Sequence, residues 1–454
     1  MRKILRKLAD RFPNRILSPL LYLYFAGIKK WLFIKPDRGD PRLHKLACYA
    51  HQTSPERLLI DVTHQVYTQD RSGIPRVVNK TSAALLNLDQ QRYSFEFVMV
   101  LNGELYTAYR FAERVLDLET GFLGPDQKVT VRDGDQMLIL DCTMDKYYSF
   151  LPTFTEIQKR GGTVSTVIND IMPMRNPEWL PQDFVKVYQA TLPTVVRSSD
   201  ILFCVSEFTA ADLSSWIQEN MPDALSRVKI TTFDQGAEIG GAALPPEPIR
   251  PALQDFLNSA DEENAPIFIQ VSIIQPRKGQ DFGLDVFEQL WASGRNERLI
   301  YVGRKGWKAE ELYERIISHK EMNQRFLFVE NANETELALI FDSALALFSP
   351  SRGEGYGLPV VEASLRGIPV LVNNLQVYRE IAGDGGIFFD IEEPGSFVRA
   401  IDRVEAMSPA ERLALTKKVR VGTWNQGAID LLAAISAAAD MRKTPSIDES
   451  SSKV

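Results

Sequence analysis

The sequence predicts an α/β protein with two Rossmann-like domains whose parallel sheets face each other across a cleft. From residue 57 to residue 372, short apolar runs alternate with longer segments of helical pattern, which is typical of parallel strands joined by crossover helices. The alternation is interrupted at residues 236–262, where three glycines and four prolines give the composition of a linker. Two such halves place a ligand site between them.

The first domain is expected at residues 55–235. A polar loop is predicted at 64–73. The stretch Ser72-Gly73-Ile74-Pro75 is predicted to open a helix that runs to about Leu88, with Pro75 near the first turn, where its missing N–H costs nothing. Asp141, Asp170 and Ser206 each stand just after a predicted strand. The strands of this half are predicted at residues 57–62, 95–101, 136–140, 163–168 and 200–205.

The second domain, with the final helices, is expected at residues 263–440. Helices are predicted at about 280–292 and from Pro359 to Arg366, and a capping box at Ser408 begins a further helix. The polar tail, 441–454, is expected to be disordered. The strands of this half are predicted at residues 267–274, 298–302, 326–329, 344–348 and 370–372.

Residues 1–54 form a separate basic, amphipathic segment. The first 50 residues hold 12 Lys/Arg and three Asp, a charge of +9, whereas the whole chain carries −7. Its apolar run at 16–28 is shorter than the roughly 20 residues of a spanning helix. Flanking basic and aromatic residues favour attachment to an anionic membrane surface. A helix packed on the body and a cleaved signal peptide are the alternatives.

Composition narrows the class of protein. With 454 residues, 44% hydrophobic and 24% charged, the chain is neither disordered, collagenous nor a coiled coil. A net charge of −7 argues against non-specific nucleic-acid binding. Three distant cysteines predict neither disulfides nor a zinc site and favour a reducing, cytoplasmic compartment. Asp133-Gly134-Asp135 could be mistaken for a metal motif, but its place before a strand indicates a turn.

Residues 349–364 are the segment richest in chemistry. The strand at 344–348 leads into a loop with three glycines and Glu354, and a helix carrying Glu362 follows. The spacing places both carboxylates on the same cleft, where they can accept hydrogen bonds from sugar or ribose hydroxyls. The glycines allow the backbone to approach a ligand closely, and the helix N-terminus favours a phosphate or a polar sugar edge.

Pro276-Arg277-Lys278-Gly279 follows the predicted strand at 267–274. Ligands bind at the carboxyl ends of strands in open α/β sheets, so two adjacent cations here indicate a phosphate site. Arginine offers a bidentate fork and lysine a point charge. Together they could neutralise a diphosphate leaving group without a metal.

These residues resemble the retaining glycosyltransferases of family 4, which have the GT-B fold. Glu354 and Glu362 match that family's E-x7-E motif, and Arg277-Lys278 match its diphosphate site. The chain departs from the family at Asn169, where many members have His or Tyr, and at Ser272, where Gly is usual. Within residues 57–435, weaker matches lie at 72–78, 169–173, 205–209, 302–307, 378–383 and 423–424.

The resemblance implies a role for each matched residue. Arg277 and Lys278 would neutralise the departing diphosphate, Glu354 would hold donor-sugar hydroxyls and Glu362 the ribose. Retention would proceed by front-face transfer, in which the leaving phosphate helps to take the acceptor proton. The catalytic residues would then be Asp170, Arg277, Lys278 and Glu354, with Asp170 facing the acceptor or the reacting sugar. The donor-binding residues would be Gly73, Arg277, Lys278, Glu354, Gly355, Tyr356, Gly357, Leu358 and Glu362, with Gly73 bringing a backbone N–H near the phosphates.

The expected enzyme is a hexosyltransferase that resembles bacterial mannosyl and rhamnosyl transferases of surface polysaccharide synthesis, lipopolysaccharide included. It would use a nucleotide-diphosphate sugar, GDP-mannose or dTDP-rhamnose, and a glycan or lipid-linked acceptor, without metal or cofactor. It would lie at the inner face of the cytoplasmic membrane. A non-catalytic sugar- or protein-binding partner with the same fold is the alternative. A nicotinamide oxidoreductase is disfavoured because no Gly-x-Gly-x-x-Gly follows the first strand.

Overall fold

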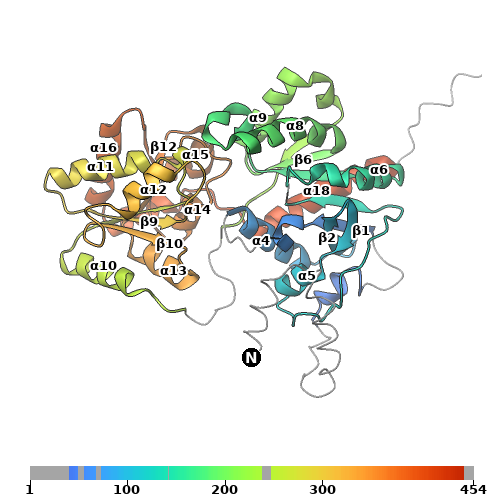
Figure 1. Cartoon of the computed structure of the whole chain (residues 1–454), viewed down its shortest axis with the longest axis horizontal. Coiled ribbons are helices and arrows are strands. Elements are labelled where there is room, and N and C mark those ends of the chain that lie inside the picture. The colour runs from blue at the N-terminus through green and yellow to red at the C-terminus, as the bar shows by residue number, and fades with distance from the viewer. Residues whose placement is uncertain (1–39, 50–55, 68–72, 142, 238–246, 444–454) are drawn as a thin grey trace, which may run out of the picture.

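The computed structural model describes residues 40–49, 56–67, 73–141, 143–237 and 247–443. These residues form two α/β halves, each built around its own sheet (Figure 1). The predicted fold class is confirmed. The apolar run at 16–28 and residues 444–454 of the predicted tail lie outside the described residues.

The first half contains a seven-stranded sheet of order β3-β2-β1-β4-β5-β6-β7. Its neighbours pair in parallel except β2 and β3, which form an antiparallel hairpin. In register, Leu58 of β1 lies opposite Phe95 of β2 and Gln136 of β4. The strands are β1 (Glu56–Asp61), β2 (Tyr93–Leu101), β3 (Glu104–Thr107), β4 (Gln136–Ile139), β5 (Val164–Ile168), β6 (Ile201–Cys204) and β7 (Lys229–Thr232).

Helices cover both faces of this sheet, which explains why its strands read as continuous apolar runs. Leu58 and Ile60 of β1 belong to one core, and Leu59 belongs to the core on the opposite face. Helices α4 and α5 pack into the first core, and α6, α8 and α9 into the second. The helices are α3 (Thr63–Tyr67), α4 (Gly73–Asn87), α5 (Tyr109–Val115), α6 (Leu151–Lys159), α7 (Met172–Arg175), α8 (Gln182–Ser198) and α9 (Glu207–Asn220), with short turns η2 (Tyr147–Phe150), η3 (Pro177–Trp179) and η4 (Pro222–Ser226).

The second half contains a six-stranded sheet of order β10-β9-β8-β11-β12-β13, and its neighbouring strands pair in parallel. Ile269 and Phe268, adjacent on β8, point into different cores on its two faces. The strands are β8 (Ile267–Val271), β9 (Arg298–Gly303), β10 (Phe326–Glu330), β11 (Ala346–Ser349), β12 (Val370–Asn373) and β13 (Gly386–Phe389). The helices are α10 (Pro251–Glu262), α11 (Gln280–Ala292), α12 (Glu310–Ile317), α13 (Glu334–Ser343), α14 (Leu358–Leu365), α15 (Gln376–Ala382), α16 (Pro394–Ala406) and α17 (Pro409–Thr416), with η5 (Pro276–Lys278) and η6 (Gly383–Gly385).

Two predicted boundaries between the halves are wrong. Residues 251–262, assigned to the linker, form α10, whose Leu253, Phe256 and Leu257 are buried in the core of the second half. The apolar face of this helix outweighs the prolines, because Pro251 occupies the first turn, where proline is tolerated. The final helix, α18 (Trp424–Lys443), was assigned to the second half, but its Trp424 and Leu431 complete the core of the first half.

The N-terminal segment and the loop after the first strand also differ from the prediction. Residues 40–49 are part of the first half, since η1 (Leu43–Lys45) places Leu43 in its core beside Leu46. The backbone N–H of Ala47 donates to the carbonyl of Phe95 on β2 at 2.9 Å. His64 lies in helix α3 rather than in the predicted polar loop, of which residues 68–72 lie outside the described part.

The sequence pattern did not reveal strands β3, β7 and β13. Strand β7 (KITT) is only partly buried at the sheet edge, and β3 and β13 are short and contain a charged residue or a glycine. Such segments lack a continuous apolar run, so pairing with a neighbour decides their conformation. The predicted turn at Asp133-Gly134-Asp135 is confirmed: Gly134 has a φ of +80° and Asp135 pairs with Arg57 at 2.6 Å.

Candidate active site

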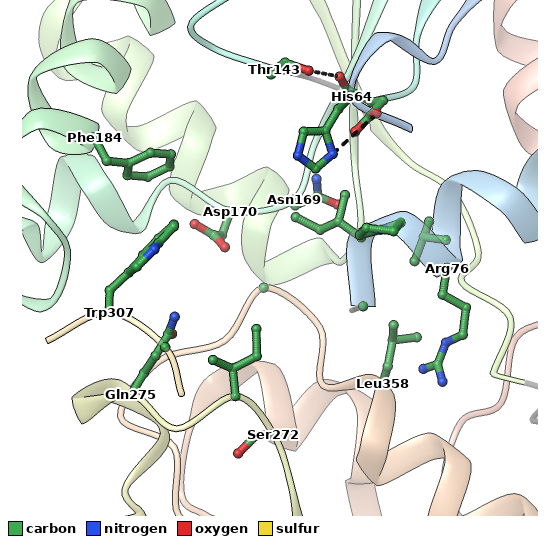
Figure 2. A pocket seen from close by; sticks show the side chains of 18 of the residues that line it. His64, Arg76, Thr143, Asn169, Asp170, Phe184, Ser272, Gln275, Trp307 and Leu358 are labelled. Carbon is green, nitrogen blue, oxygen red and sulfur yellow. Dashed lines mark hydrogen bonds and ion pairs between the residues drawn. The ribbon is translucent and has the colours of Figure 1, made fainter. Parts of the chain in front are cut away.

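All ten predicted site residues line a single cleft of about 2120 Å³ between the two halves. Figure 2 shows Asn169 and Asp170 of the first half facing Ser272, Gln275 and Leu358 of the second half across this space. The cleft lies at the carboxyl ends of the central strands, because β5 ends two residues before Asp170 and β8 ends shortly before Arg277. The structure thus brings together residues from loops that are distant in the sequence.

Glu354 is the centre of a compact charged cluster. Its carboxylate forms ion pairs with Arg277, at 3.2 Å, and with Lys278, and it accepts a hydrogen bond from the Ser351 hydroxyl at 2.7 Å. The three charged side chains are 10–19% exposed. A carboxylate between two cations is strongly stabilised in such a shielded place.

The charges of this cluster shift one another's ionisation. Burial alone would raise the pKa of Glu354, but the positive charges of Lys278 and Arg277 outweigh it and lower the pKa to about 2. Burial and the neighbouring Arg277 charge lower the pKa of Lys278. Burial would lower the pKa of Arg277, but Glu354 and Asp170 raise it. The cluster thus combines one carboxylate with two basic side chains, Arg277 and Lys278.

The two loops that carry the cluster are held against each other by one side-chain and one backbone hydrogen bond. Arg277 donates from Nη1 to the carbonyl of Gly353 at 2.9 Å, and the N–H of Arg352 donates to the carbonyl of Arg277 at 2.7 Å. Gly279 has a φ of +68°, and a Cβ there would lie 2.2 Å from the carbonyl oxygen of Pro350. Only glycine allows this approach, which sets the position of both cations.

Asp170 lies in the cleft on the side of the first half. Its Oδ1 accepts the N–H of Met172 at 3.1 Å, and the Tyr188 hydroxyl donates to its backbone carbonyl at 2.6 Å. Burial raises the pKa of Asp170, and the nearby charge of Arg277 acts against that shift. Asp170 and the cation pair thus influence each other across the cleft.

Gly355 joins the two halves. Its carbonyl accepts hydrogen bonds from the hydroxyls of Ser206, at 2.6 Å, and Thr209, at 3.2 Å. A Cβ at Gly355 would lie 2.0 Å from the carbonyl oxygen of Asn169, so a larger residue would force the loops apart. The stretch 205–209 matches the family in sequence, but the hydrogen bonds from its hydroxyls to the loop that carries Gly355 were not predicted.

Glu362 and Gly73 lie together at another part of the cleft. Glu362, only 2% exposed, forms an ion pair with Arg76 of α4, a partner that the sequence did not indicate. Gly73 begins α4 and lies 3.7 Å, measured from an ideal Cβ, from Leu358 at the start of α14. A ribose at Glu362 would therefore meet a carboxylate already shared with an arginine of the other half.

Tyr356, Gly357 and Leu358 form the turn into α14. Gly357 has a φ of +107°, and a Cβ on it would lie 2.7 Å from the ring of Tyr378. The Tyr378 hydroxyl shares a hydrogen bond with Ser349 at 2.5 Å, which fixes this buried ring under the loop. The Tyr356 hydroxyl donates to the carbonyl of Gln235 at 3.3 Å. The glycine is therefore required both by its φ and by the ring beneath it.

His64 and Asp141 line the cleft without having been predicted as site residues. The His64 Nδ1 lies 3.9 Å from an Asp141 carboxylate oxygen, which also accepts the N–H of Gln65 at 3.0 Å. Burial raises the pKa of Asp141, against the effect of a charged His64. The place of Asp141 just after a strand was the one sequence signal that pointed to this pair.

Ser272 lies in the loop after β8, which the Gln280 side chain holds in place. The Gln280 side-chain amide donates to its hydroxyl at 2.8 Å and to the carbonyl of Ile273 at 2.9 Å.

Within the described residues, no group of three or more His, Cys, Asp and Glu side chains could hold a metal ion. In the same part of the chain, no helix is both long and apolar enough to cross a membrane.

Residues 254–420 match the family described as Glycosyl transferases group 1. The chain is 29% identical over 381 residues to the serotype-specific mannosyltransferase WbdA of Escherichia coli, a match that covers 83% of this chain and 46% of the relative. It is 26% identical to the O-antigen chain mannosyltransferase RfbU of Salmonella typhimurium, over 34% of this chain and 42% of the relative. The chain thus spans less than half the length of these relatives.

Solved structures with the same fold are more distant in sequence. The chain superposes on Anabaena HepE, solved with UDP and glucose, with a TM-score of 0.51 at 14% identity, covering 85% of this chain and 97% of that one. It superposes on the trehalose-6-phosphate synthase OtsA with a TM-score of 0.55 at 12% identity, covering 84% and 99%. These matches show the two-domain GT-B fold, and the resemblance to glycosyltransferases and to mannosyltransferases of O-antigen synthesis is confirmed.

Proposed function

We propose that this chain is a retaining hexosyltransferase that moves a sugar from a nucleotide-diphosphate donor to a glycan acceptor in bacterial surface polysaccharide synthesis. The observation that carries the proposal is the shielded Glu354 carboxylate, ion-paired with both Arg277 and Lys278 in the cleft between the halves. All three residues lie within the part of the chain that matches the Glycosyl transferases group 1 family. A structural ion pair needs only one cation, whereas a site for a sugar diphosphate needs an excess of positive charge.

Donor binding would rearrange the charges of this cluster. The diphosphate carries more negative charge than a single carboxylate. It would therefore replace Glu354 as the counterion of Arg277 and Lys278. Glu354 would then be free to accept hydrogen bonds from hydroxyls of the transferred sugar. In the absence of donor, Glu354 keeps both cations in place, which limits the cost of ordering them when the donor binds.

The reaction follows from the same groups. The bond between the sugar C1 and the phosphate oxygen breaks, and the phosphate leaves with the electron pair. The acceptor hydroxyl oxygen bonds to C1 from the same face, and its proton passes to the departing phosphate. Arg277 and Lys278 stabilise the negative charge that develops on that phosphate, an interaction that is stronger in the transition state than before it. Asp170 faces the acceptor or the reacting sugar.

Mannose is the favoured donor sugar, because the relatives that match most of the chain are named mannosyltransferases. A thermal-shift panel of GDP-mannose, dTDP-rhamnose, UDP-glucose and ADP-glucose tests this choice. A ligand of the folded state raises the melting temperature, and we expect GDP-mannose to raise it most. Release of GDP on addition of a mannan fragment then measures transfer. If dTDP-rhamnose gives the larger shift, the donor is rhamnose, and if none of the four gives a shift, the proposed function is wrong.

Catalysis is proposed to need no metal, since two cations of the protein already neutralise the diphosphate. Transfer measured with and without EDTA tests this proposal, and we expect the rate to stay within about twofold. A loss of activity in EDTA that Mn²⁺ or Mg²⁺ restores would assign the diphosphate to a metal ion instead.

A non-catalytic binding partner with the same fold is the second candidate. The cluster of Glu354, Arg277 and Lys278 counts against this candidate. A protein without catalytic activity would not need three ion-paired side chains in its cleft. If GDP-mannose binds tightly but neither transfer nor slow hydrolysis of the donor can be detected, the second candidate is correct.

We further propose that the protein attaches to the inner face of the cytoplasmic membrane, where a lipid-linked acceptor would be found. The proposal rests on the charge of +9 within residues 1–50, most of which lie outside the described part of the chain. Basic residues near an anionic surface contribute on the order of 1 kcal/mol each at low salt.

A further inference from the structure

Two large aromatic side chains lie exposed in the cleft and contact each other across it. Phe184, in the first turn of α8, and Trp307, after β9, have ring centroids 5.1 Å apart with an interplanar angle of 41°. Phe184 is 37% exposed and Trp307 is 46% exposed, although both belong to the lining of the cleft. Large aromatic rings normally bury their faces, so a concave place that keeps two of them open is typical of a ligand site.

The backbone on both sides holds this aromatic pair in position. A Cβ at Gly306 would lie 2.5 Å from the Ile273 side chain and 2.6 Å from the Ile274 carbonyl, so the loop that carries Trp307 is pressed onto the strand-end loop beside it. The next residue, Lys308, donates to the Glu178 carbonyl of the first half at 2.6 Å. The rings are therefore presented at a fixed distance, which is the condition for binding without a large entropy loss.

The pair lies next to the proposed reacting centre. Figure 2 shows the Asp170 carboxylate beside the rings of Phe184 and Trp307. Phe184 also contacts Tyr188, with ring centroids 6.1 Å apart, and the Tyr188 hydroxyl donates to the Asp170 carbonyl at 2.6 Å. The nearby Gln275 lines the same part of the cleft and offers an amide. An apolar platform is thus combined with polar groups at its edge.

We propose that Phe184 and Trp307 form the acceptor subsite, where they bind a pyranose ring of the glycan; this inference rests on the proposed function. One face of a pyranose presents C–H groups with a slight positive charge, which pack on the negative face of an aromatic ring. Its hydroxyls point sideways, toward groups such as Asp170 and Gln275. The donor is already accounted for by Arg277, Lys278 and Glu354, whose loops belong to the other half from Phe184.

Substitutions that separate ring stacking from simple packing test the subsite. Trp307→Leu and Phe184→Leu keep an apolar side chain and remove the aromatic face. We expect the acceptor KM, measured with GDP-mannose and mannotriose, to rise at least about tenfold in each, with the GDP-mannose KM and the slow hydrolysis of donor changed less than about twofold. Trp307→Phe keeps a ring and should restore most of the affinity. Tyr148→Leu removes an aromatic residue that is 48% exposed and does not line the cleft, so it should match the wild type.

A direct binding readout completes the experiment. Mannotriose added without donor should change the tryptophan fluorescence of the wild type, and Trp307→Phe should lose that signal. If both leucine variants weaken GDP-mannose binding as much as acceptor use, the pair merely joins the two halves and the subsite is wrong. Unchanged acceptor KM values would overturn it as well. Failure of the proposed function is distinguishable, because the wild type would then neither bind nor hydrolyse any sugar nucleotide.

Discussion

At the scale of single residues, the proposed transfer reaction would depend on the ion pairs of Glu354 with Arg277 and Lys278. The carboxylate is shielded from solvent and forms ion pairs with Arg277 and Lys278. Its negative charge therefore compensates the positive charges of these two buried side chains when no donor is bound. Removing one partner of such a group leaves an uncompensated charge, which is costly in a buried place. Substitutions at these three positions should therefore differ in their effects on stability and on rate.

Arg277→Ala should lower kcat strongly while the fold persists. Lys278 still balances Glu354 in this variant, so the melting temperature should fall by only a few degrees. Loss of one charge-assisted contact to the departing phosphate removes roughly 2.7–4 kcal/mol of transition-state stabilisation, which is about 10²–10³ in rate. Steady-state kinetics with GDP-mannose measures this loss, and Lys320→Ala, an exposed cation outside the cleft, is the matched control. A variant within twofold of wild type would contradict the role.

Glu354→Gln should give a stability difference that depends on pH. Because Lys278 and Arg277 lower the pKa of Glu354 to about 2 from 4.5, the folded state holds the carboxylate ionised where the unfolded chain protonates it. The stabilisation is therefore complete above about pH 5 and declines as the pH falls from there toward 2. The gap in unfolding free energy between wild type and variant should narrow by about 1 kcal/mol between pH 7 and pH 3.5, because the wild type loses the stabilisation that its ionised carboxylate provides. Denaturant titrations at several pH values measure it. A gap that does not vary with pH would mean that the ion pairs do not stabilise the fold.

At the scale of elements, the first turn of helix α9 forms several hydrogen bonds between the first half and the second half. Its N-cap, Ser206, accepts the N–H of Thr209 and donates to the Gly355 carbonyl. Glu380 of α15 accepts the N–H groups of Glu207 and Phe208, both at 2.9 Å. A carboxylate at a helix N-terminus is favoured by the free N–H groups and by the helix dipole. The first turn of α9 thus connects the two halves by hydrogen bonds next to the loop that carries Gly355.

Glu380→Ala should loosen the closed arrangement of the halves. Loss of a cap typically costs about 0.5–2 kcal/mol, and here that cost falls on the contact between domains. We expect a larger radius of gyration by small-angle X-ray scattering and a lower kcat/KM for the donor. Glu380→Gln keeps an oxygen acceptor and should lie between wild type and alanine. If scattering and kinetics of the alanine variant equal those of the wild type, other contacts alone hold the halves together.

At the scale of the whole molecule, the chain crosses between the halves twice, and the two crossings lie side by side. Gly236 pairs with Gly422, and Arg420 donates to Asp234 at 2.9 Å. A Cβ at Gly236 would lie 2.4 Å from the ring of Trp424, so the first crossing is closely packed against the start of α18. After the second crossing, α18 returns to the first half and packs into its core.

The N-terminal segment should attach the protein to anionic membranes without being needed for the fold. Residues 40–49 pack into the core through Leu43 and Leu46, so the informative truncation begins at Asp40. The full chain should sediment with phosphatidylglycerol vesicles at low salt and be released at high salt, whereas the chain from Asp40 should stay in the supernatant and bind GDP-mannose normally. A truncated chain that still sediments, or a full chain that ignores the vesicles, would contradict membrane attachment by residues 1–39.

The sequence predicted most strands because their apolar runs are continuous, as in a sheet covered on both faces. Edge strands such as β7 were not predicted, because a partly buried strand has no continuous apolar run. Helix α18 was placed with the wrong half for a related reason. A helical pattern reveals that a helix has an apolar face, but it does not tell which of two cores receives that face.

By itself, the sequence determined the half of the site that would hold the donor. Arg277 follows β8 and Glu354 follows β11, which are neighbours in the sheet, so two local motifs suffice to predict their meeting. Only the tertiary structure decided the contacts across the cleft, such as Ser206 to Gly355, which are 149 residues apart, and Phe184 to Trp307. These residues meet because two separately folded sheets face each other, and no local pattern of polarity encodes the distance between side chains on different domains.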